Sequence, residues 1–362
     1  MKIDGVPYRT IWLSTDGQAV EVIDQTALPH ALRTLRLNTA ADAARAISAM
    51  VVRGAPLIGA TAAWGMALAA REDPSDAGLE RAAAHLGASR PTAVNLRWAV
   101  EAMLAVLRPL PAARRAEAAA QEAARLCDAE AAACAAIGVH GAALIAAAYD
   151  GTRPVEVLTH CNAGWLASVD WGMSLSPVYK AAEQGVPVHV WVDETRPRNQ
   201  GAALTAWELL RHGVPHTVIV DNAGGHLMQQ GRVDLCIVGS DRVAANGDVC
   251  NKIGTYLKAL AAHDNGVPFL AALPSSTIDW SLSDGAAIPI EERAADEVTH
   301  VTGLTDAGET GRVRVTPQGS PAANFGFDVT PARLVTAIIT ERGVCDASRE
   351  GLLSLYPEQA AA

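Results

Sequence analysis

The spacing of hydrophobic and polar residues changes near residue 151. Beyond it, short runs rich in Val, Ile and Leu alternate with segments of helical periodicity. Strands are predicted at Val155–Thr159, Val186–Val192, His216–Val220, Val233–Val238 and Val267–Leu273, and helices at Pro177–Gln184, Ala202–His212, Asn222–Gln230 and Ile253–Asp264. This alternation predicts an α/β fold with a mostly parallel, doubly wound sheet. Ligands of such a sheet bind at the carboxyl ends of its strands.

The residues before 151 have a mixed pattern. Two short strands are predicted at Tyr8–Leu13 and Val20–Ile23, followed by mostly helical periodicity. Pro56 suits the first turn of a helix that continues through Ala70, because its missing N–H is not needed there. Residues 111–149 are dense in strong helix formers and predict one long helix or two stacked helices. We therefore divide the 362 residues into a smaller, mainly helical N-terminal domain (1–125), a linking helix (126–150) and the sheet domain (151–362).

The charge balance narrows the class of partner. Lys and Arg total 29 against 39 Asp and Glu, a formal net charge of −10. Nucleic acids and anionic membranes require a basic face, so we expect neither as a partner, whereas a small anionic substrate needs only a few arginines in one cleft. The uncharged run Leu57–Ala70 has 14 residues. A membrane-spanning helix needs about 20, so none is predicted.

The six cysteines have no CxxC spacing, and the first residues lack the apolar stretch of a signal peptide. Both features are typical of a reduced, cytoplasmic protein. We expect a soluble cytoplasmic enzyme or regulator.

Polar residues concentrate in the loops that follow the predicted strands. These loops are 159–164, 193–201 and 239–252. Because the carboxyl ends of parallel strands share one edge of the sheet, we expect the three loops to converge on one crevice. The dinucleotide and P-loop fingerprints are absent from the sequence. Arg53-Gly54-Ala55-Pro56 nevertheless opens a helix, whose free N–H groups favour an anion, and Arg90 offers a second guanidinium.

Two residues of these loops suit acid–base chemistry, and each has a structural alternative. Cys161 is either a small buried hydrophobic residue or a reactive thiol. Asp241 is a candidate acid, but it could also cap a helix beginning near Asn251 or pair with Arg242. His160 is an alternative base, unless it only holds the loop by a hydrogen bond.

A cluster of carboxylates raises the question of a metal. Asp193 and Glu194, with Asp248, could hold Mg²⁺. We prefer ion pairing of Asp193 and Glu194 with Arg196 and Arg198, and expect neither a metal nor a cofactor.

Several long motifs resemble one family. They are RGAPLIG, THCNAG, DETRPRNQGA, GSDRVAANGD followed by NK, and LPSSTIDW, and the likeness extends over nearly the whole chain. Together they resemble the methylthioribose-1-phosphate isomerases of methionine salvage. The same superfamily includes ribose-1,5-bisphosphate isomerases and the non-catalytic regulatory subunits of the initiation-factor nucleotide exchanger. The resemblance implies a Rossmann-like C-terminal domain, a homodimer and conversion of 5-methylthioribose 1-phosphate to 5-methylthioribulose 1-phosphate.

Matched position by position, the resemblance also implies site residues. It places the catalytic pair on Cys161 and Asp241. It places the substrate contacts on Arg53, Gly54, Ala55, Arg90, Gln200, Asn251 and Lys252. Ser240 and Cys250 stand where the family pattern has Ala, which affects the surroundings of the acid and removes no catalytic group.

The chemistry fits these residues. The anomeric oxygen carries phosphate, so an acid must protonate the ring oxygen before the ring can open, which suits Asp241 if burial raises its pKa. Hydrogen then moves from C2 to C1, either through an enolate with a Cys161 thiolate as base, which we favour, or by a direct hydride shift.

Two alternative functions stay open. They are an isomerase of a related 5-substituted ribose phosphate, such as 5-deoxyribose 1-phosphate or ribose 1,5-bisphosphate, and a non-catalytic sugar-phosphate or nucleotide sensor.

Overall fold

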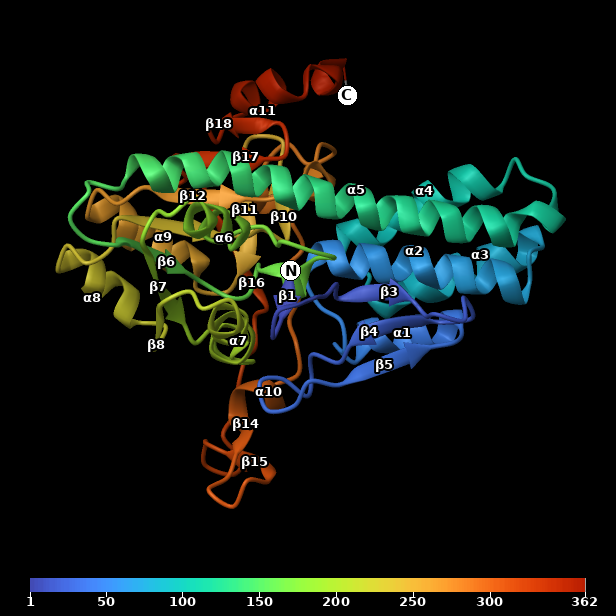
Figure 1. The fold of residues 1–362 in the computed structure, drawn as a ribbon, viewed down its shortest axis with the longest axis horizontal. Helices are drawn as coiled ribbons and strands as arrows, with labels where there is room; N and C mark the ends of the chain where they lie inside the picture. Colours follow the sequence, from blue (N-terminus) through green and yellow to red (C-terminus); the bar gives the residue numbers. More distant parts are fainter. Residues whose placement is uncertain (362) are drawn as a thin grey trace.

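The computed structural model describes residues 1–361, and its N-terminal part combines small antiparallel strands with a layer of helices (Figure 1). The strands are β1 (Lys2–Ile3), β2 (Val6–Pro7), β3 (Ile11–Leu13), β4 (Val20–Ile23) and β5 (Thr34–Leu37), and the helices are α1 (Ala40–Ser48), α2 (Ala55–Glu72), α3 (Asp76–Ser89) and α4 (Val94–Leu107). The helix predicted after Pro56 is α2. It is buried on all sides, because it packs against α1, α3, α4 and the long helix α5 (Ala112–Ala147).

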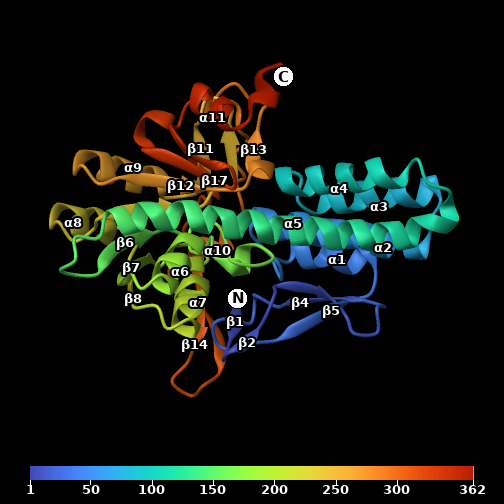
Figure 2. The same cartoon turned by 45° about the horizontal axis from the view of Figure 1, so that its top comes forward.

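Residues 111–149 form the single helix α5, which runs from the N-terminal helices to the large sheet (Figure 2). It packs on α2 and on α6 (Ser176–Glu183). Small residues allow the close approach to α6. A Cβ atom on Gly138 would lie 2.1 Å from the Ser176 hydroxyl oxygen, and one on Gly141 would lie 2.4 Å from the Pro177 ring.

The prediction that no helix is long and apolar enough to span a membrane is wrong. Helix α5 contains an 18-residue window of mean hydropathy 1.6. The sequence argument from Leu57–Ala70 overlooked the uncharged stretch after Glu130. The core helix of a soluble protein passes the same test, and α5 has 39% of this window buried inside the protein.

The predicted parallel sheet is present and has seven strands. Their order is β18 (Gly343–Cys345), β17 (Ala337–Thr340), β12 (Phe269–Ala272), β9 (Leu235–Val238), β6 (Val155–Thr159), β7 (Val188–Asp193) and β8 (His216–Ile219). Every neighbouring pair is parallel except β17 with β18. The five predicted strands are confirmed, with bounds that differ by at most two residues. Chain order along the sheet reverses between β6 and β9, where doubly wound sheets bind ligands.

Helices α6, α7 (Ala206–Arg211), α8 (Ala223–Gln229) and α9 (Thr255–Asp264) connect these strands. The segment predicted as a helix over 202–212 has two parts, because a π-helical turn at Gly201–Thr205 precedes α7. Strands β6, β9 and β12 are buried on both faces, which explains their nearly continuous hydrophobic sequences.

A second sheet follows the carboxyl end of β9. Its strands, in order, are β13 (Ile278–Asp279), β10 (Arg242–Ala244), β11 (Val249–Lys252) and β16 (Phe327–Thr330). Asn251 therefore lies in a strand, and the helix predicted near it begins at Thr255. A hairpin of β14 (His300–Leu304) and β15 (Thr310–Arg314) projects from the body after α10 (Asp296–Thr299), and α11 (Arg349–Leu355) lies near the C-terminus (Figure 1).

Candidate active site

One pocket gathers every residue that the sequence placed at the site. It lies between the N-terminus of α2 and the loops at the carboxyl ends of β6, β7 and β9. The predicted residues that line it are Arg53, Gly54, Ala55, Arg90, Cys161, Gln200, Asp241, Asn251 and Lys252. The convergence of the three polar loops is thus observed, while the role of each residue remains a proposal.

Helix α2 begins at the pocket because Gly54 permits a tight turn. Gly54 has a φ of +95°, which side chains rarely adopt, and a Cβ atom there would lie 2.4 Å from the Ala167 carbonyl oxygen. Pro56 occupies the first turn, as predicted. The first N–H groups of α2 have no partner within the helix, so this end presents partial positive charge to the pocket.

Cationic side chains surround the pocket. Arg53 donates both terminal nitrogens to Asn162, one to the amide oxygen and one to the backbone oxygen at 2.6 Å. Lys252 donates to the Gly326 carbonyl at 2.8 Å. Arg90 lies 3.4 Å from the Glu291 carboxylate. A chain with a net charge of −10 therefore concentrates positive charge here, as an anionic ligand requires.

Asp241 faces this positive charge with a free carboxylate. No residue in the described part of the chain donates a hydrogen bond to it. Burial raises its pKa, and the charges of Lys252, Arg90 and Arg53 oppose that rise. The two structural alternatives for Asp241 are wrong, because Arg242 contacts Asp279 at 3.4 Å and α9 is preceded by Gly254.

Cys161 lies in a strained backbone turn. Its φ is +67°, in the left-handed region. Its N–H donates to the Thr195 hydroxyl at 2.8 Å, and its carbonyl accepts from the Thr205 hydroxyl at 2.7 Å. Burial raises the pKa of the Cys161 thiol, while Arg53 and Lys252 lower it. The thiolate expected from the sequence is therefore not the favoured form, since burial outweighs the two cations.

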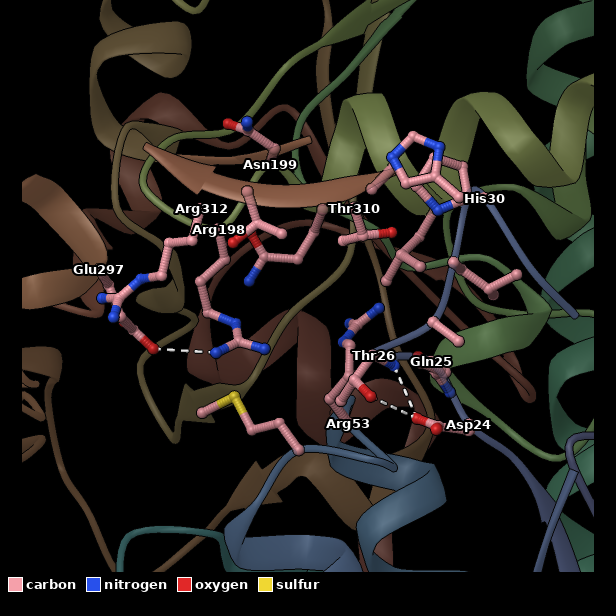
Figure 3. Close-up of a pocket in the computed structure, with 18 of the residues that line it drawn as sticks. Asp24, Gln25, Thr26, His30, Arg53, Arg198, Asn199, Glu297, Thr310 and Arg312 are labelled. Carbon is pink, nitrogen blue, oxygen red and sulfur yellow. Dashed lines mark hydrogen bonds and ion pairs between the residues drawn. The ribbon is translucent and has the colours of Figure 1, made fainter. Parts of the chain in front are cut away.

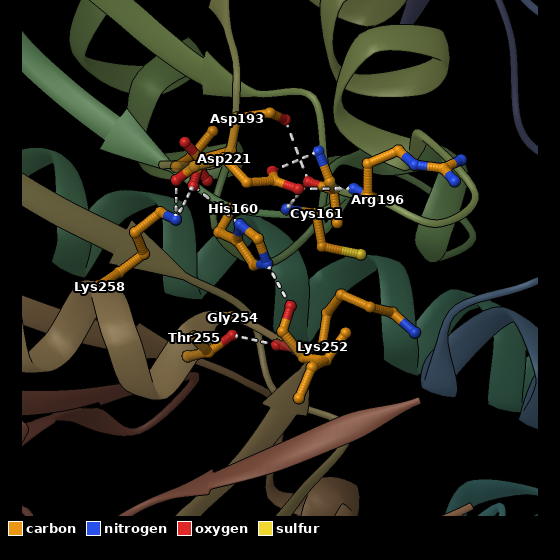
Figure 4. A network of polar contacts seen from close by, with 12 residues as sticks. His160, Cys161, Asp193, Arg196, Asp221, Lys252, Gly254, Thr255 and Lys258 are labelled. Atoms are coloured by element: carbon orange, nitrogen blue, oxygen red, sulfur yellow. Dashed lines mark hydrogen bonds and ion pairs between the residues drawn. The ribbon is translucent and has the colours of Figure 1, made fainter. Parts of the chain in front are cut away.

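His160 holds the loops together and is not free to act as a base. Its Nδ1 lies 2.8 Å from the Asp193 carboxylate, and its Nε2 donates to the Ile253 carbonyl at 2.8 Å (Figure 4). The side chain is 1% exposed. The alternative of a loop hydrogen bond is thus the observed one.

The predicted ion pairs of Asp193 with Arg196 and Arg198 are wrong, whereas Glu194 lies close enough to Arg196 for that charge to lower its pKa against the effect of burial. Asp193 contacts His160 and the Lys258 ammonium, at 3.2 Å, and Arg198 contacts Glu297. Asp193 ends a strand and points into the interior, so arginines that follow it in sequence do not reach it.

The carboxylates of the Mg²⁺ alternative are used elsewhere. Asp248 accepts from the N–H groups of Gly285 and Ala332. A different trio, His160, Asp193 and Asp221, has ligand atoms within 4.8 Å of one another. The Lys258 ammonium already contacts Asp193 and the Asp221 backbone oxygen (Figure 4). The Lys258 cation therefore lies beside two residues of this trio.

Gln200 lies at the neck between this pocket and a larger outer cavity. Met50, Arg53 and Gln200 line both spaces, and Figure 3 shows the outer cavity with Arg198, Glu297 and Arg312 around it. Gln200 is 7% exposed, and its side-chain oxygen has no partner in the described part of the chain. A bound hydroxyl group would satisfy it.

Some pocket residues were missed by the sequence analysis. They are Met50, Ala163, Met173, Arg293 and Phe327. Arg293 comes from an irregular segment before the hairpin, where no motif or periodicity marks a functional position, and Phe327 is the first residue of β16. The Met50 position has a φ of +57°, which the sequence does not indicate.

Comparison with known proteins shows the family to which the chain belongs. A family model described as the initiation factor 2 subunit family matches residues 51–347. The solved structure of translation initiation factor eIF-2B subunit delta from A. fulgidus is 36% identical, with a TM-score of 0.80, over 97% of this chain and all of that chain.

Proteins with a higher sequence identity to this chain are named methylthioribose-1-phosphate isomerases. Methylthioribose-1-phosphate isomerase of Paramagnetospirillum magneticum is 65% identical over 99% of this chain and 100% of its own length. That of Methylobacterium nodulans is 68% identical over 99% of both. The crystal structure of 5-methylthioribose 1-phosphate isomerase from Pyrococcus horikoshii has a TM-score of 0.83 at 38% identity, over 97% of this chain and 96% of that one. The chain belongs to the initiation factor 2 subunit family and, within it, to the methylthioribose-1-phosphate isomerases.

Proposed function

We propose that this isomerase converts 5-methylthioribose 1-phosphate to 5-methylthioribulose 1-phosphate, with Asp241 and Cys161 as its catalytic residues. The observation that carries the proposal is a single pocket in which a buried thiol and an acid that receives no hydrogen bond from residues 1–361 lie among several cations. A sensor of sugar phosphates needs the cations but not the acid and the thiol. The same residues therefore favour an enzyme over a non-catalytic binder.

The phosphate would bind between the N-terminus of α2 and the cations. Arg53 and Arg90 supply charge-assisted hydrogen bonds, Lys252 adds a third cation, and the free N–H groups of α2 complete the site. Asn251 and Gln200 remain for the sugar hydroxyls. Fixing the phosphate in this way leaves C1 and C2 of the sugar at a defined distance from the catalytic pair.

Asp241 would open the ring. Burial raises its pKa, so the carboxyl group keeps a proton more readily than an exposed aspartate does. It donates that proton to the ring oxygen while the bond from C1 to the ring oxygen breaks. The electron pair of the broken bond stays on the oxygen, which becomes the C4 hydroxyl.

Cys161 would accept the proton that leaves C2. In the enolate route, it removes hydrogen from C2 as a proton; the C2 hydroxyl then gives its proton to the Asp241 carboxylate left by ring opening, and the enolate is protonated at C1 by the Cys161 thiol. In the hydride route, hydrogen moves with its electron pair from C2 to C1, and Cys161 accepts the C2 hydroxyl proton as the carbonyl forms. Either role needs the thiolate, and the raised pKa of Cys161 makes that form a minor one at neutral pH.

Isotope transfer separates these routes. Substrate deuterated at C2 is turned over in ordinary water, and unlabelled substrate in heavy water. On the enolate route, which remains our proposal, we expect solvent hydrogen at C1 of the product. Full retention of deuterium, together with near-normal turnover by Cys161→Ser, would overturn that route, because it would then lack a base.

The nature of the C5 substituent follows from the other side of the pocket. Met50, Met173 and Phe327 offer apolar contact, which suits a methylthio group. Arg293 is a further cation there, but it already contacts Glu297 at 2.7 Å and the Met50 sulfur at 3.0 Å. A second phosphate at C5 would have to compete with Glu297 for it.

Parallel assays test this choice. Turnover is measured with 5-methylthioribose 1-phosphate, 5-deoxyribose 1-phosphate and ribose 1,5-bisphosphate. We expect the highest kcat/KM with the methylthio compound. A higher value with the bisphosphate would move the assignment to the related isomerase and give Arg293 the role of a second phosphate ligand.

We further infer a Rossmann-like domain over 151–362, a linking helix over 126–150, an N-terminal domain over 1–125, and a homodimer in the cytoplasm. The strand order supports the first of these inferences. The free state of all the cysteines supports a reducing compartment. Light scattering of the purified protein tests the dimer, which a monomer mass at micromolar concentration would exclude.

A further inference from the structure

The buried carboxylate of Glu208 has no part in the mechanism proposed above. Glu208 lies in α7, is 0% exposed and does not line the pocket. Its two oxygens accept four hydrogen bonds. One oxygen accepts from the Asn162 amide and the Leu166 N–H, each at 2.9 Å, and the other accepts from the Trp165 N–H and the Tyr179 hydroxyl, each at 3.0 Å. A fully buried carboxylate is costly to ionise unless donors satisfy it, and these four hydrogen bonds offset part of that cost.

The Glu208 carboxylate determines how the Asn162 amide is oriented. Because Glu208 only accepts, it selects the NH₂ side of Asn162, which leaves the amide oxygen pointing toward Arg53. Arg53 then donates to that oxygen and to the Asn162 carbonyl. The contacts form a directional series from Glu208 through Asn162 to Arg53, and the Thr205 hydroxyl, which donates to the Cys161 carbonyl, also accepts from the Asn162 NH₂ group at 3.2 Å.

The backbone is built around the same carboxylate. A Cβ atom on Gly164 would lie 1.9 Å from a Glu208 oxygen, so only glycine fits there. The loop from Cys161 to Leu166 therefore lies against the carboxylate, with the Trp165 and Leu166 N–H groups turned toward it and the Cys161 thiol lining the pocket. The negative charge of Glu208 also lies close enough to favour the charged form of the buried Arg53.

We propose that Glu208 is a positioning residue that holds Arg53 in the phosphate site through the Asn162 amide. It touches no reacting atom and acts through Asn162. The inference rests on the proposed function for the identity of the substrate. Placement of Arg53 for an anion does not depend on which sugar carries the phosphate.

Glu208→Gln tests the first contact of this series. The measurements are made at pH 8, because burial raises the pKa of Glu208 to about 7. The substituted amide has one NH₂ group, which faces either the Asn162 NH₂ group and the Leu166 N–H or the Trp165 N–H with donor against donor, whereas the Tyr179 hydroxyl can turn to accept. If Asn162 turns to relieve this, its own NH₂ group faces the Arg53 guanidinium. We expect KM for the sugar phosphate and Kd for inorganic phosphate to rise at least tenfold, with kcat within about threefold of wild type.

Glu130→Gln is the matched control. Glu130 is another interior carboxylate with backbone and side-chain donors, from Val169 and Cys134, and it does not line the pocket. We expect this variant to lose some thermal stability and to keep KM and phosphate affinity. Equal rises of KM in Glu130→Gln and Glu208→Gln would show a general loss of structure and overturn the proposal.

A swap of polarity gives the sharper test. In the double variant Glu208→Gln with Asn162→Asp, the new amide donates to the new carboxylate, whose other oxygen again accepts from Arg53. Asn162→Asp alone sets two carboxylates against each other and should impair phosphate binding. We expect the double variant to bind phosphate at least fivefold more tightly than Glu208→Gln, while its melting temperature stays below that of wild type, because either Leu166 or Trp165 still lacks its acceptor.

The outcomes separate this proposal from the proposed function. Calorimetric titration with inorganic phosphate reports on Arg53 whether or not the protein isomerises the sugar. Failure of the wild-type protein to turn over the methylthio substrate would remove the proposed function and leave the phosphate result standing. Unchanged phosphate affinity in Glu208→Gln, or a double variant weaker than Glu208→Gln, would overturn the role of Glu208. If Glu208→Gln does not fold, Asn162→Ala removes the intermediary instead, and unchanged phosphate affinity in that variant counts equally against the proposal.

Discussion

Two carboxylates near the pocket, the partly buried Asp241 and the fully buried Glu208, have opposite surroundings. Asp241 receives no hydrogen bond from the described residues and faces the cavity among Arg53, Arg90 and Lys252. Glu208 receives four hydrogen bonds and faces the interior. Folding satisfies polar groups wherever it can, so a group left without partners at the pocket wall marks a position that the substrate completes. This difference in hydrogen bonding separates Asp241, proposed to react with the substrate, from Glu208, proposed to position other side chains.

The most direct way to break this comparison is Asp241→Asn. The substitution keeps the size of the side chain and removes the transferable proton, so we expect kcat to fall at least hundredfold, the usual scale for loss of a general acid. Phosphate affinity should stay within a few-fold of wild type, since Arg53 and Lys252 remain. A near-normal kcat, measured with the methylthio substrate, would show that Asp241 is not the general acid.

Cys161→Ser gives the next largest effect. A serine hydroxyl is hardly ionised at neutral pH, so we expect turnover to fall by about a hundredfold. Because burial raises the pKa of the Cys161 thiol above its ordinary value of 9.0, the thiolate fraction of the free protein grows about tenfold with each pH unit from 7 to 9.

Alkylation of Cys161 by iodoacetamide measures that fraction directly. We expect its rate to rise across this pH range, with Cys161→Ser correcting for the other cysteines. A rate that is already constant above pH 7 would show a stable thiolate and contradict the effect of burial. Activity of Cys161→Ser close to wild type would make the thiol structural.

Much of the candidate site could be predicted because one topological rule operates. Cys161, Gln200 and Asp241 follow three parallel strands, and the carboxyl ends of such strands meet at one edge of the sheet. The strand positions followed from short β-branched runs between Gly and Pro residues. What the rule predicts is proximity, and proximity of these three residues is what the structure shows.

Side-chain direction could not be predicted in the same way. Asp193 and Arg196 are close in sequence, yet Asp193 points to His160 and Lys258 in the interior. Glu208 lies in a segment with an ordinary helical pattern, and nothing in that pattern shows that the Cys161 loop folds over it. Arg293 reaches the pocket from an irregular segment. Each of these depends on contacts between residues distant in sequence, which periodicity does not encode.

A smaller effect sharpens the contrast within the cation set. Arg53→Ala and Arg90→Ala should each weaken phosphate binding by about 2–3 kcal/mol if both make charge-assisted contacts. Only Arg53→Ala also leaves the Asn162 oxygens without their donors, so we expect a lower melting temperature for that variant alone. Calorimetric titration and thermal unfolding measure the two quantities. Unchanged affinity in either variant would reduce that arginine to a structural role.

The smallest effect concerns Glu130, a partly buried carboxylate in α5 that does not line the pocket. Burial raises its pKa from 4.5 to about 7, and the hydrogen bonds from Cys134 and Val169 oppose the rise. Between these values the folded protein binds more protons than the unfolded chain. The free energy of unfolding contributed by this group is therefore greatest below pH 4.5, falls as the pH rises to about 7, and is constant above that.

The full shift in pKa corresponds to roughly 3 kcal/mol, and because Glu130 is only partly shielded from solvent we expect about 1–2 kcal/mol. Glu130→Gln cannot ionise, so its unfolding free energy should lack this fall. Urea unfolding of wild type and Glu130→Gln at pH 5.5 and pH 8 isolates the group, because every other titration is common to both proteins. The advantage of wild type over the variant should shrink as the pH rises. An advantage that grows with pH would mean that the two hydrogen bonds outweigh burial, and Glu130 would then be a charged carboxylate satisfied by its donors.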